Sequence, residues 1–359
     1  MFLIKKQVSY FINIGYYGEM RFRQALLFAS LVPLISGCFS QSSSSQQPQP
    51  SASPTVPQDA LLERTRSSGQ QVQVSRLEEF SKQQFSGSDL KLGRVLDDNA
   101  AYTRYYITYQ SGELTISGIM NVPKGQGPFP LLILNHGYIG PAVYTNGRGL
   151  KREQDYLARR GYVVLHPDYR NHADSTKVGN VELNFRLGYV EDVINAINAA
   201  KYSGFDFIDT SRVGMLGHSM GGGVAQTIMV THPDLVDAFV LFAPVSSNYV
   251  DSFNKWVVSR REVAEEIRER YGSPDEFPDF WAGLSPRTYF GRVSSPVMLH
   301  HGAQDESVPL AWSERTVALL QEKEKDIIFH VYEGEKHEFI DQWPLVMQRT
   351  VDFFDEHLR

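Results

Sequence analysis

Short apolar runs recur between residues 104 and 357, and stretches with helical spacing of apolar residues separate them. Runs rich in β-branched and aromatic residues predict strands. These runs lie at 104–110, 114–123, 130–135, 162–167, 212–216, 238–244, 297–302 and 327–332. Helices are predicted at about 151–160, 182–201, 221–231, 311–321 and 344–357. Residues 60–85 are polar with scattered leucines, and we expect them to be helical.

The order of these elements predicts the fold class. The first two strands are joined by the short turn "SGE", which favours an antiparallel hairpin. The run "PLLILN" at 130–135 is continuously apolar, as is typical of a central strand covered on both faces. Strands that alternate with helices then predict an α/β fold with a mostly parallel sheet covered by helices on both faces.

A long insertion at 247–292 interrupts the alternation and predicts a helical cap over the carboxyl edge of the sheet. Its charged run "SRREVAEEIRERYG" reads as a solvated helix face. The insertion is rich in aromatic residues, which either line an acyl or aromatic pocket or, for most of them, form the core of the cap itself. They are Tyr249, Phe253, Trp256, Phe277, Phe280 and Trp281.

Charge and cysteine content exclude several function classes. The 359-residue chain has a formal net charge of -6 and no basic run, which argues against a nucleic-acid-binding surface. Its one cysteine, Cys38, allows no intrachain disulfide and supports neither a zinc site nor a cysteine nucleophile. We therefore expect no metal and no organic cofactor.

The N-terminal region has the layout of an export signal. Residues 20–38 contain two arginines, an apolar run too short for a membrane span, and small residues that end in "ISGC". This ending resembles a bacterial lipobox, in which Cys38 would carry the lipid. The predicted organisation is an upstream extension with signal peptide (1–37), a lipidated cysteine with a Ser/Gln/Pro-rich tether (38–59), and one domain (60–359). A membrane-anchored protein of the cell envelope is expected; the alternative is a secreted or periplasmic protein with a free cysteine.

The stretch 213–228 is the first candidate for chemistry. An apolar strand runs into "GHSMGG" and then into a helix, so that Ser219 lies at a tight strand-to-helix turn. Residues 217–221 fit G-x-S-x-G, the pattern that lifts a nucleophilic serine above a sheet. The alternative is a glycine-rich helix start with an incidental serine.

A serine hydroxyl needs a base, and the base needs a carboxylate. His337 follows the last predicted strand, in "GEKHEF", and is the best candidate for the base. Asp305, in the loop after the penultimate strand, is the candidate acid, with Glu306 and Asp341 as alternatives. Sites in parallel sheets form at the carboxyl ends of strands, which is where these residues fall.

Attack on a carbonyl also requires hydrogen-bond donors for the developing oxyanion. The backbone N–H of Met220, next to Ser219, is one expected donor. The second is expected from "NHGYIG" at 135–140, where we favour the backbone N–H of Tyr138, alone or with its phenol. The alternative is that this stretch is only a tight turn.

With these motifs in order, the chain resembles the catalytic domain of the prolyl oligopeptidase family, within the α/β-hydrolase superfamily. The similarity covers about residues 105–357 and includes "ISGIMNVPKGQGPFPLLILNHG", "GHSMGG", "SPRTYFGRVSSPVMLHHGAQDESVP" and "YEGEKHEF". It implies the α/β-hydrolase fold and a Tyr138 hydroxyl that donates to the oxyanion. The family's Asp-x-Arg-Gly loop corresponds to 168–171, where Asn171 replaces the glycine, so Asp168 and Arg170 are expected to be structural.

The chain departs from the family in one respect. Family peptidases carry a β-propeller before the catalytic domain, whereas here residues 60–103 offer room for about one blade of 40–45 residues. The predicted function is therefore a serine hydrolase that cleaves a small peptide or ester through an acyl-enzyme. A carboxylesterase for acetyl or short-acyl esters, or of the dienelactone hydrolase type, is the first alternative. A non-catalytic envelope lipoprotein that binds a ligand is the second. A dehalogenase is disfavoured because it would need aspartate at position 219, and the sequence predicts no oligomeric state.

Overall fold

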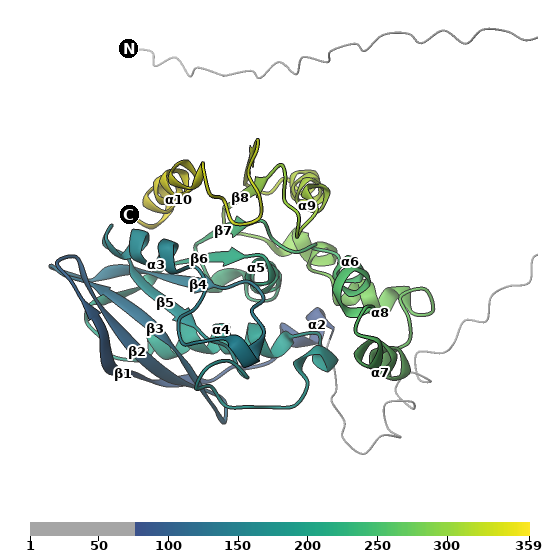
Figure 1. Cartoon of the computed structure of the whole chain (residues 1–359), viewed down its shortest axis with the longest axis horizontal. Helices are drawn as coiled ribbons and strands as arrows, with labels where there is room; N and C mark the ends of the chain where they lie inside the picture. Colours follow the sequence, from purple (N-terminus) through teal and green to yellow (C-terminus); the bar gives the residue numbers. More distant parts are fainter. Residues whose placement is uncertain (1–75) are drawn as a thin grey trace, which may run out of the picture. The chain divides into compact units, whose positions relative to one another are not determined.

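A computed structural model of the protein describes residues 76–359, which form one mixed sheet flanked by helices (Figure 1). The strands of this part of the chain are β1 (Gly87–Asp98), β2 (Tyr102–Ser111), β3 (Leu114–Pro123), β4 (Phe129–Asn135), β5 (Val163–Pro167), β6 (Ile208–His218), β7 (Ala238–Phe242), β8 (Val297–Gly302) and β9 (Ile327–Tyr332). Their order in the sheet is β1-β2-β3-β5-β4-β6-β7-β8-β9. The pairs β1–β2, β2–β3 and β3–β5 are antiparallel, and the remaining pairs, β4–β5 included, are parallel. The predicted fold class is confirmed.

The helices follow the predicted order as well. The described α-helices are α2 (Leu77–Phe80), α3 (Lys151–Ala158), α4 (Leu187–Lys201), α5 (Met220–Thr231), α6 (Tyr249–Ser252), α7 (Arg261–Tyr271), α8 (Pro278–Gly283), α9 (Leu310–Glu322) and α10 (Trp343–Leu358). Shorter helical turns are η1 (Pro141–Val143), η2 (Val181–Asn184), η3 (Pro233–Leu235), η4 (Phe253–Val257) and η5 (Pro286–Arg292). Within the described part of 60–85, only α2 is helical, so the expected longer helix is not found there.

Alternating side chains of the central strands build two apolar layers, one on each face of the sheet. In β4, Leu131 and Ile133 join the cluster that contains apolar residues of α4, α5 and α9. Leu132 and Leu134 join the opposite cluster, with residues of α3 and α10. All four leucine and isoleucine side chains are fully buried, which is why this strand reads as a continuous apolar run. Helices therefore cover both faces, as Figure 1 shows for α4 below the sheet and α3 and α10 above it.

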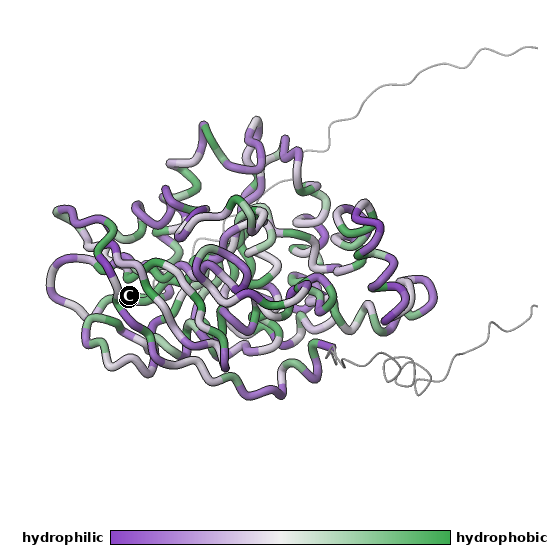
Figure 2. Tube along the Cα trace, turned by 60° about the horizontal axis from the view of Figure 1, so that its bottom comes forward, coloured by the Kyte–Doolittle hydropathy of each residue, from purple (hydrophilic) through white to green (hydrophobic). Residues whose placement is uncertain are grey.

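Residues 247–292 are largely helical and have a core of their own. Phe253 and Trp281 are completely buried in an apolar cluster of this segment. In α7, Ala264, Ile267 and Tyr271 form the buried face, while the charged side chains lie outside, as the charged run predicts. In Figure 2 the hydrophilic stretches of the chain accordingly lie mainly at the periphery of the domain and the hydrophobic ones inside it. We call residues 247–292 the cap.

The predicted signal segment 1–37, the tether 38–59 and the lipidation site Cys38 lie outside the described residues. These expectations therefore stay predictions. Within residues 76–359, no helix combines the length and the apolarity needed to cross a bilayer.

Two buried histidines make the stability of this fold depend on pH. His136 and His166 are fully buried and their rings stack at 5.3 Å. The pKa of each is lowered to about 3, mainly by burial and, for His136, also by repulsion from the His166 ring when both are charged. Because an unfolded histidine titrates near 6.5, only the unfolded state takes up these protons between about pH 6.5 and 3.

We therefore expect the contribution of these two histidines to the free energy of unfolding to be constant above pH 7 and to fall as the pH drops, by about 1.4 kcal/mol per pH unit for each histidine. Urea unfolding at pH 7, 6 and 5 measures this slope. In the variant His166→Gln, the unfolded state can no longer take up a proton at this position. The slope of the free energy of unfolding against pH should therefore become shallower by about 1.4 kcal/mol per pH unit. Equal stability of the wild type at pH 7 and pH 5 would contradict the assignment.

Candidate active site

Ser219 occupies the turn between β6 and α5. Its backbone has φ 55° and ψ −116°, a strained conformation for a residue with a side chain. A backbone hydrogen bond ties the turn to the neighbouring strand: the N–H of Ser219 donates to the carbonyl oxygen of Phe242 in β7 at 2.9 Å. Its side chain is half-buried at the carboxyl edge of the sheet. This is the strand-turn-helix context that the G-x-S-x-G pattern predicts.

The glycines of the motif are required by close backbone contacts. A Cβ on Gly221 would lie 2.0 Å from the carbonyl oxygen of Asn135 in β4. A Cβ on Gly217 would lie 2.4 Å from the carbonyl oxygen of Gly221. Both distances are far below any van der Waals contact, so the turn can close over β4 only without side chains at these positions.

Asp305 and His337 meet at the same edge of the sheet. They lie in the loops after β8 and β9, which are neighbours, and His337 Nδ1 is 2.7 Å from Asp305 Oδ2. The other oxygen of Asp305 accepts the backbone N–H groups of Ser307 and Val308, both at 2.8 Å. An Nδ1–H bonded to a carboxylate leaves the Nε2 of His337 free to accept a proton.

The surroundings of Asp305 favour the ionised form of its carboxylate. Burial of its side chain raises its pKa, but hydrogen bonds from His301, His337 and the N–H of Val308 outweigh burial and hold the pKa well below its usual range. His301, whose Nε2 lies 3.2 Å from Asp305 Oδ2, was not singled out as a supporting group by the sequence. The sequence feature that points to His301 is its place at the end of the apolar run "VMLHHG".

The other two acids do not occupy this position. The carboxylate of Glu306 lies 3.4 Å from the backbone N–H of His337 and not at its ring. Asp341 is exposed at the surface. Of the three candidate acids, Asp305 is thus the one whose carboxylate contacts the ring of His337.

His337 also lies beside the serine turn. The ring of His218, the residue before Ser219, is 4.6 Å from the ring of His337, and its Nε2 is 3.2 Å from the His337 carbonyl oxygen. Among the described residues no hydrogen bond joins the Ser219 hydroxyl to the imidazole. In enzymes without substrate such a hydrogen bond is often long and tightens only in the complex.

The segments that carry the two expected oxyanion donors adjoin Ser219. Gly223 is the first residue of α5 whose N–H donates back into the turn, to the Ser219 carbonyl, so the N–H of Met220 has no partner within the helix. The segment before Tyr138 packs on the serine, because a Cβ on Gly137 would lie 3.2 Å from Ser219 Cβ. Tyr138 itself is 59% exposed, and the Arg186 guanidinium lies 5.2 Å from its ring centre.

Asp168 and Arg170 belong to buried networks that join the strands to their loops. Asp168 is completely buried, and Arg170 pairs with Asp192 at 2.7 Å. The Asp168 carboxylate accepts hydrogen bonds from four groups: the hydroxyls of Ser117 and Tyr144, the amide of Asn146 and the N–H of Gly147. Every strong acceptor position of this carboxylate is therefore used within the protein.

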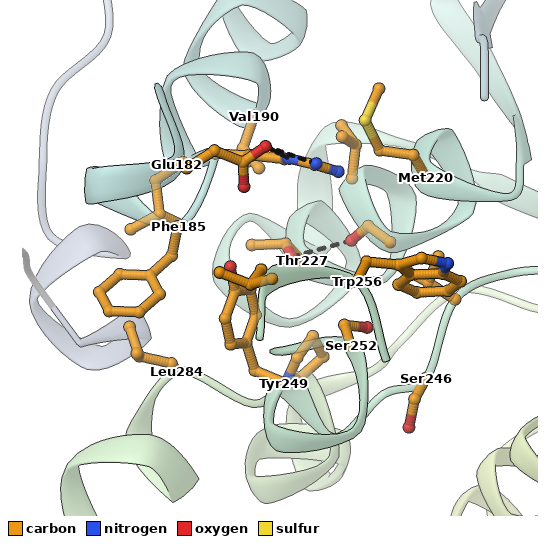
Figure 3. A pocket seen from close by; sticks show the side chains of 17 residues that line it. Glu182, Phe185, Val190, Met220, Thr227, Ser246, Tyr249, Ser252, Trp256 and Leu284 are labelled. Carbon is orange, nitrogen blue, oxygen red and sulfur yellow. Dashed lines mark hydrogen bonds and ion pairs between the residues drawn. The ribbon is translucent and has the colours of Figure 1, made fainter. Parts of the chain in front are cut away.

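A cavity of about 100 Å³ lies between α5 and the cap (Figure 3). Its residues come from η2 and α4 with the two residues between them, from α5, from the loop after β7 and from the cap. Most of them are apolar: Glu182, Phe185, Arg186, Leu187, Val190, Met220, Gly223, Val224, Thr227, Val245, Ser246, Tyr249, Ser252, Trp256, Val257, Leu284 and Pro286. Ser219 and His337 are not part of the wall. The cavity reaches the serine turn through Met220, the residue that follows Ser219.

The aromatic residues of the cap divide between its core and this cavity. Phe253 and Trp281 are buried in the cap, and Phe277 and Phe280 pack against them. Tyr249 and Trp256 line the cavity, and Tyr249 also packs against the core of the cap. The structure thus gives both of the roles that the sequence left open. Within residues 76–359, no group of three or more histidine, cysteine or acidic side chains is placed to hold a metal ion.

Comparisons with known proteins agree with this architecture. Residues 148–359 match the model of the prolyl oligopeptidase family. Dipeptidyl aminopeptidase BIII of Pseudoxanthomonas mexicana is 27% identical over 251 residues, which are 67% of this chain and 34% of that protein. Esterase EstD of Thermotoga maritima is 25% identical over 228 residues, 56% of this chain and 53% of that protein. The matched regions thus span a third to about half of these relatives.

Solved structures of peptidases and esterases share the fold. Pyrococcus horikoshii acylaminoacyl peptidase superimposes with a TM-score of 0.59 at 19% identity, over 72% of this chain and 42% of that one. The acetyl xylan esterase from Paenibacillus sp. R4 superimposes with a TM-score of 0.61 at 16% identity, over 84% of this chain and 100% of that one. The family match covers more than half of the chain and includes the serine turn and both loops that carry Asp305 and His337. The chain belongs to the prolyl oligopeptidase family of α/β-hydrolases.

Proposed function

We propose that the protein is a serine hydrolase that cleaves a peptide or an ester bond through an acyl-enzyme. Ser219 attacks the carbonyl carbon, and His337 takes the hydroxyl proton and returns it to the leaving group. Asp305 holds the imidazole in the required tautomer and stabilises its positive charge. Water then attacks the acyl-enzyme with the same base, which releases the acid and restores Ser219.

Oxyanion stabilisation is assigned to the backbone N–H of Met220 and to Tyr138, through its N–H or its phenol. Each such donor contributes about 3–4 kcal/mol to lowering the barrier. The Met220 N–H points out of the first turn of α5, where the helix dipole also favours negative charge.

One observation carries this proposal. A buried carboxylate with a depressed pKa lies 2.7 Å from Nδ1 of a histidine, in loops at the sheet edge where the strained serine turn also lies. A protein that only binds a ligand has no need for this arrangement.

The proposal is tested with three reagents on the purified protein. A fluorophosphonate probe should label Ser219 in the folded protein, and p-nitrophenyl acetate and a short peptide p-nitroanilide should show which bond is cleaved. Turnover of the ester alone identifies an esterase, and turnover of the anilide identifies a peptidase. A folded protein in which Ser219 does not react would make the chain a binding protein.

We also propose that the protein is anchored in the cell envelope by a lipid on Cys38. The support is the apolar segment that ends in "ISGC" and the Ser/Gln/Pro-rich tract that follows it. In a bacterial host fed a labelled fatty acid, the full chain should be labelled and should fractionate with membranes. Replacing Cys38 by alanine should abolish the label, whereas Ser36→Ala, two residues away, should keep it. Label that survives in Cys38→Ala would contradict the anchor.

A further inference from the structure

The polar end of the cavity holds a carboxylate oxygen that has no partner. Glu182 in η2 is 9% exposed at its side chain and lines the cavity. Its Oε1 accepts hydrogen bonds from Arg186 Nε and Nη2, at 2.9 and 2.6 Å, and from Arg260 Nη1 at 2.9 Å. Its Oε2 is buried without a hydrogen-bond partner. In Figure 3 this second oxygen points into the cavity, as does the hydroxyl of Tyr249.

An unused oxygen on a buried carboxylate is costly, because the oxygen has lost its hydration without gaining another hydrogen-bond donor. Three groups on a substrate could in principle satisfy it: an ammonium, a carboxylic acid or a neutral hydroxyl. The local charges decide between them. Glu182 is already paired with two guanidinium groups, those of Arg186 and Arg260, so the cluster carries one net positive charge.

The three candidates differ in what they would meet there. An ammonium would approach two cations. A carboxylic acid is ionised at neutral pH, and its carboxylate would face the Oε2 of Glu182 directly. A neutral hydroxyl donates to Oε2 without adding charge, and hydrogen bonds to ionised acceptors are the strong ones. The site therefore suits a neutral O–H donor.

The rest of the cavity fixes the shape of that ligand. Most of its wall is apolar and includes the rings of Phe185 and Trp256. The charged side chain of Arg186 also lines it, next to the carboxylate. The cavity meets the reaction site at Met220, whose N–H we assign to the acyl carbonyl oxygen. His337, which protonates the leaving group, does not line it. The occupant is therefore the acyl part of the substrate.

We propose that this cavity is the acyl pocket and that Glu182 selects apolar or aromatic acyl groups that end in a neutral hydroxyl, such as a 4-hydroxyphenyl group. This inference rests on the proposed serine hydrolase function. The same chemistry occurs in two kinds of substrate, esters of hydroxyphenyl acids and peptides cleaved after tyrosine.

Matched substrate pairs test the selection. The p-nitrophenyl esters of 3-(4-hydroxyphenyl)propanoate and 3-phenylpropanoate form one pair, and the N-acetylated p-nitroanilides of tyrosine and phenylalanine form the other. We expect kcat/KM for the hydroxylated member to be roughly 10- to 100-fold higher in the class of substrate that the enzyme cleaves. A ratio near one in the cleaved class overturns the inference, and so does a preference for the matching 4-(aminomethyl)phenyl compound.

Two variants locate the effect. Glu182→Gln keeps the size of the side chain and should bring the ratio of the two kcat/KM values close to one. Glu191→Gln also removes a carboxylate that pairs with an arginine, Arg170, but lies outside the cavity wall. Its ratio should stay within about twofold of the wild-type value. An unchanged ratio in Glu182→Gln overturns the role of this residue.

The test separates this inference from the proposed function. The selection ratio of the wild type needs no variant, so a Glu182→Gln protein that fails to fold still leaves the substrate-pair test decisive. If the fluorophosphonate probe does not label the folded protein and no substrate is cleaved, the proposed function fails. If substrates are cleaved with a ratio near one, only the acyl selection fails.

Discussion

Replacing Ser219 by alanine should lower kcat about 10⁶-fold on whichever substrate the protein cleaves. The hydroxyl is the atom that forms the acyl bond, and nothing else at the turn can replace it. His337→Ala should cost about as much, because the hydroxyl without its base is a poor nucleophile. The measurement is kcat under saturating substrate, with circular dichroism to show that each variant is folded.

The double variant makes this a test of a shared mechanism. If Ser219 and His337 act in one proton transfer, removing both should cost no more than removing either. Effects that multiply in the double variant would mean that the two side chains act independently. The test is informative because, among the described residues, no hydrogen bond joins these two side chains. Fluorophosphonate labelling should be lost in Ser219→Ala.

Much of the fold could be predicted because its central strands are buried on both faces. Strands such as β4, β5 and β8 each contain a run of at least three apolar residues, and their side chains are almost all buried. The sequence does not predict the strand β1, because this strand is not buried on both faces. It pairs with β2 at the edge of the sheet with several register shifts, and most of its side chains are exposed, so its sequence carries no alternation.

The functional site likewise has a part that the sequence predicts and a part that it does not. Ser219, Asp305 and His337 each follow a strand directly, so the topology of a parallel sheet brings them to one edge. Glu182 lies in the short turn η2 and Arg186 just before α4. Arg260, the third member of the cluster, is 78 positions away from Glu182. No periodicity marks such a cluster, because it forms only when the cap folds over α4. It was therefore found from coordinates alone.

Replacing Asp305 by asparagine is expected to lower kcat about 10⁴-fold and to leave the structure intact. Asparagine presents either its amide nitrogen or its carbonyl oxygen to Nδ1, and the amide nitrogen would hold His337 in the tautomer that cannot take the proton from Ser219. The hydrogen bonds that depress the pKa of Asp305 keep it ionised at every pH above its ordinary value near 4. Loss of wild-type activity between pH 8 and 5 therefore cannot come from Asp305. Rates of Asp305→Asn across this range should be low throughout, without recovery at alkaline pH below the point where hydroxide itself attacks.

Glu306→Gln is the matched control, because it removes the carboxylate next in sequence. Glu306 is exposed and only its contact with the His337 backbone N–H is lost, so kcat should stay within about threefold of wild type. The two variants change the formal charge equally, which removes long-range electrostatics as an explanation for any difference between them. A large loss in Glu306→Gln together with a small one in Asp305→Asn would mean that the loop rearranges on substrate binding and that Glu306 is the working acid. The opposite pattern assigns the orientation of the imidazole to the 2.7 Å contact with Asp305.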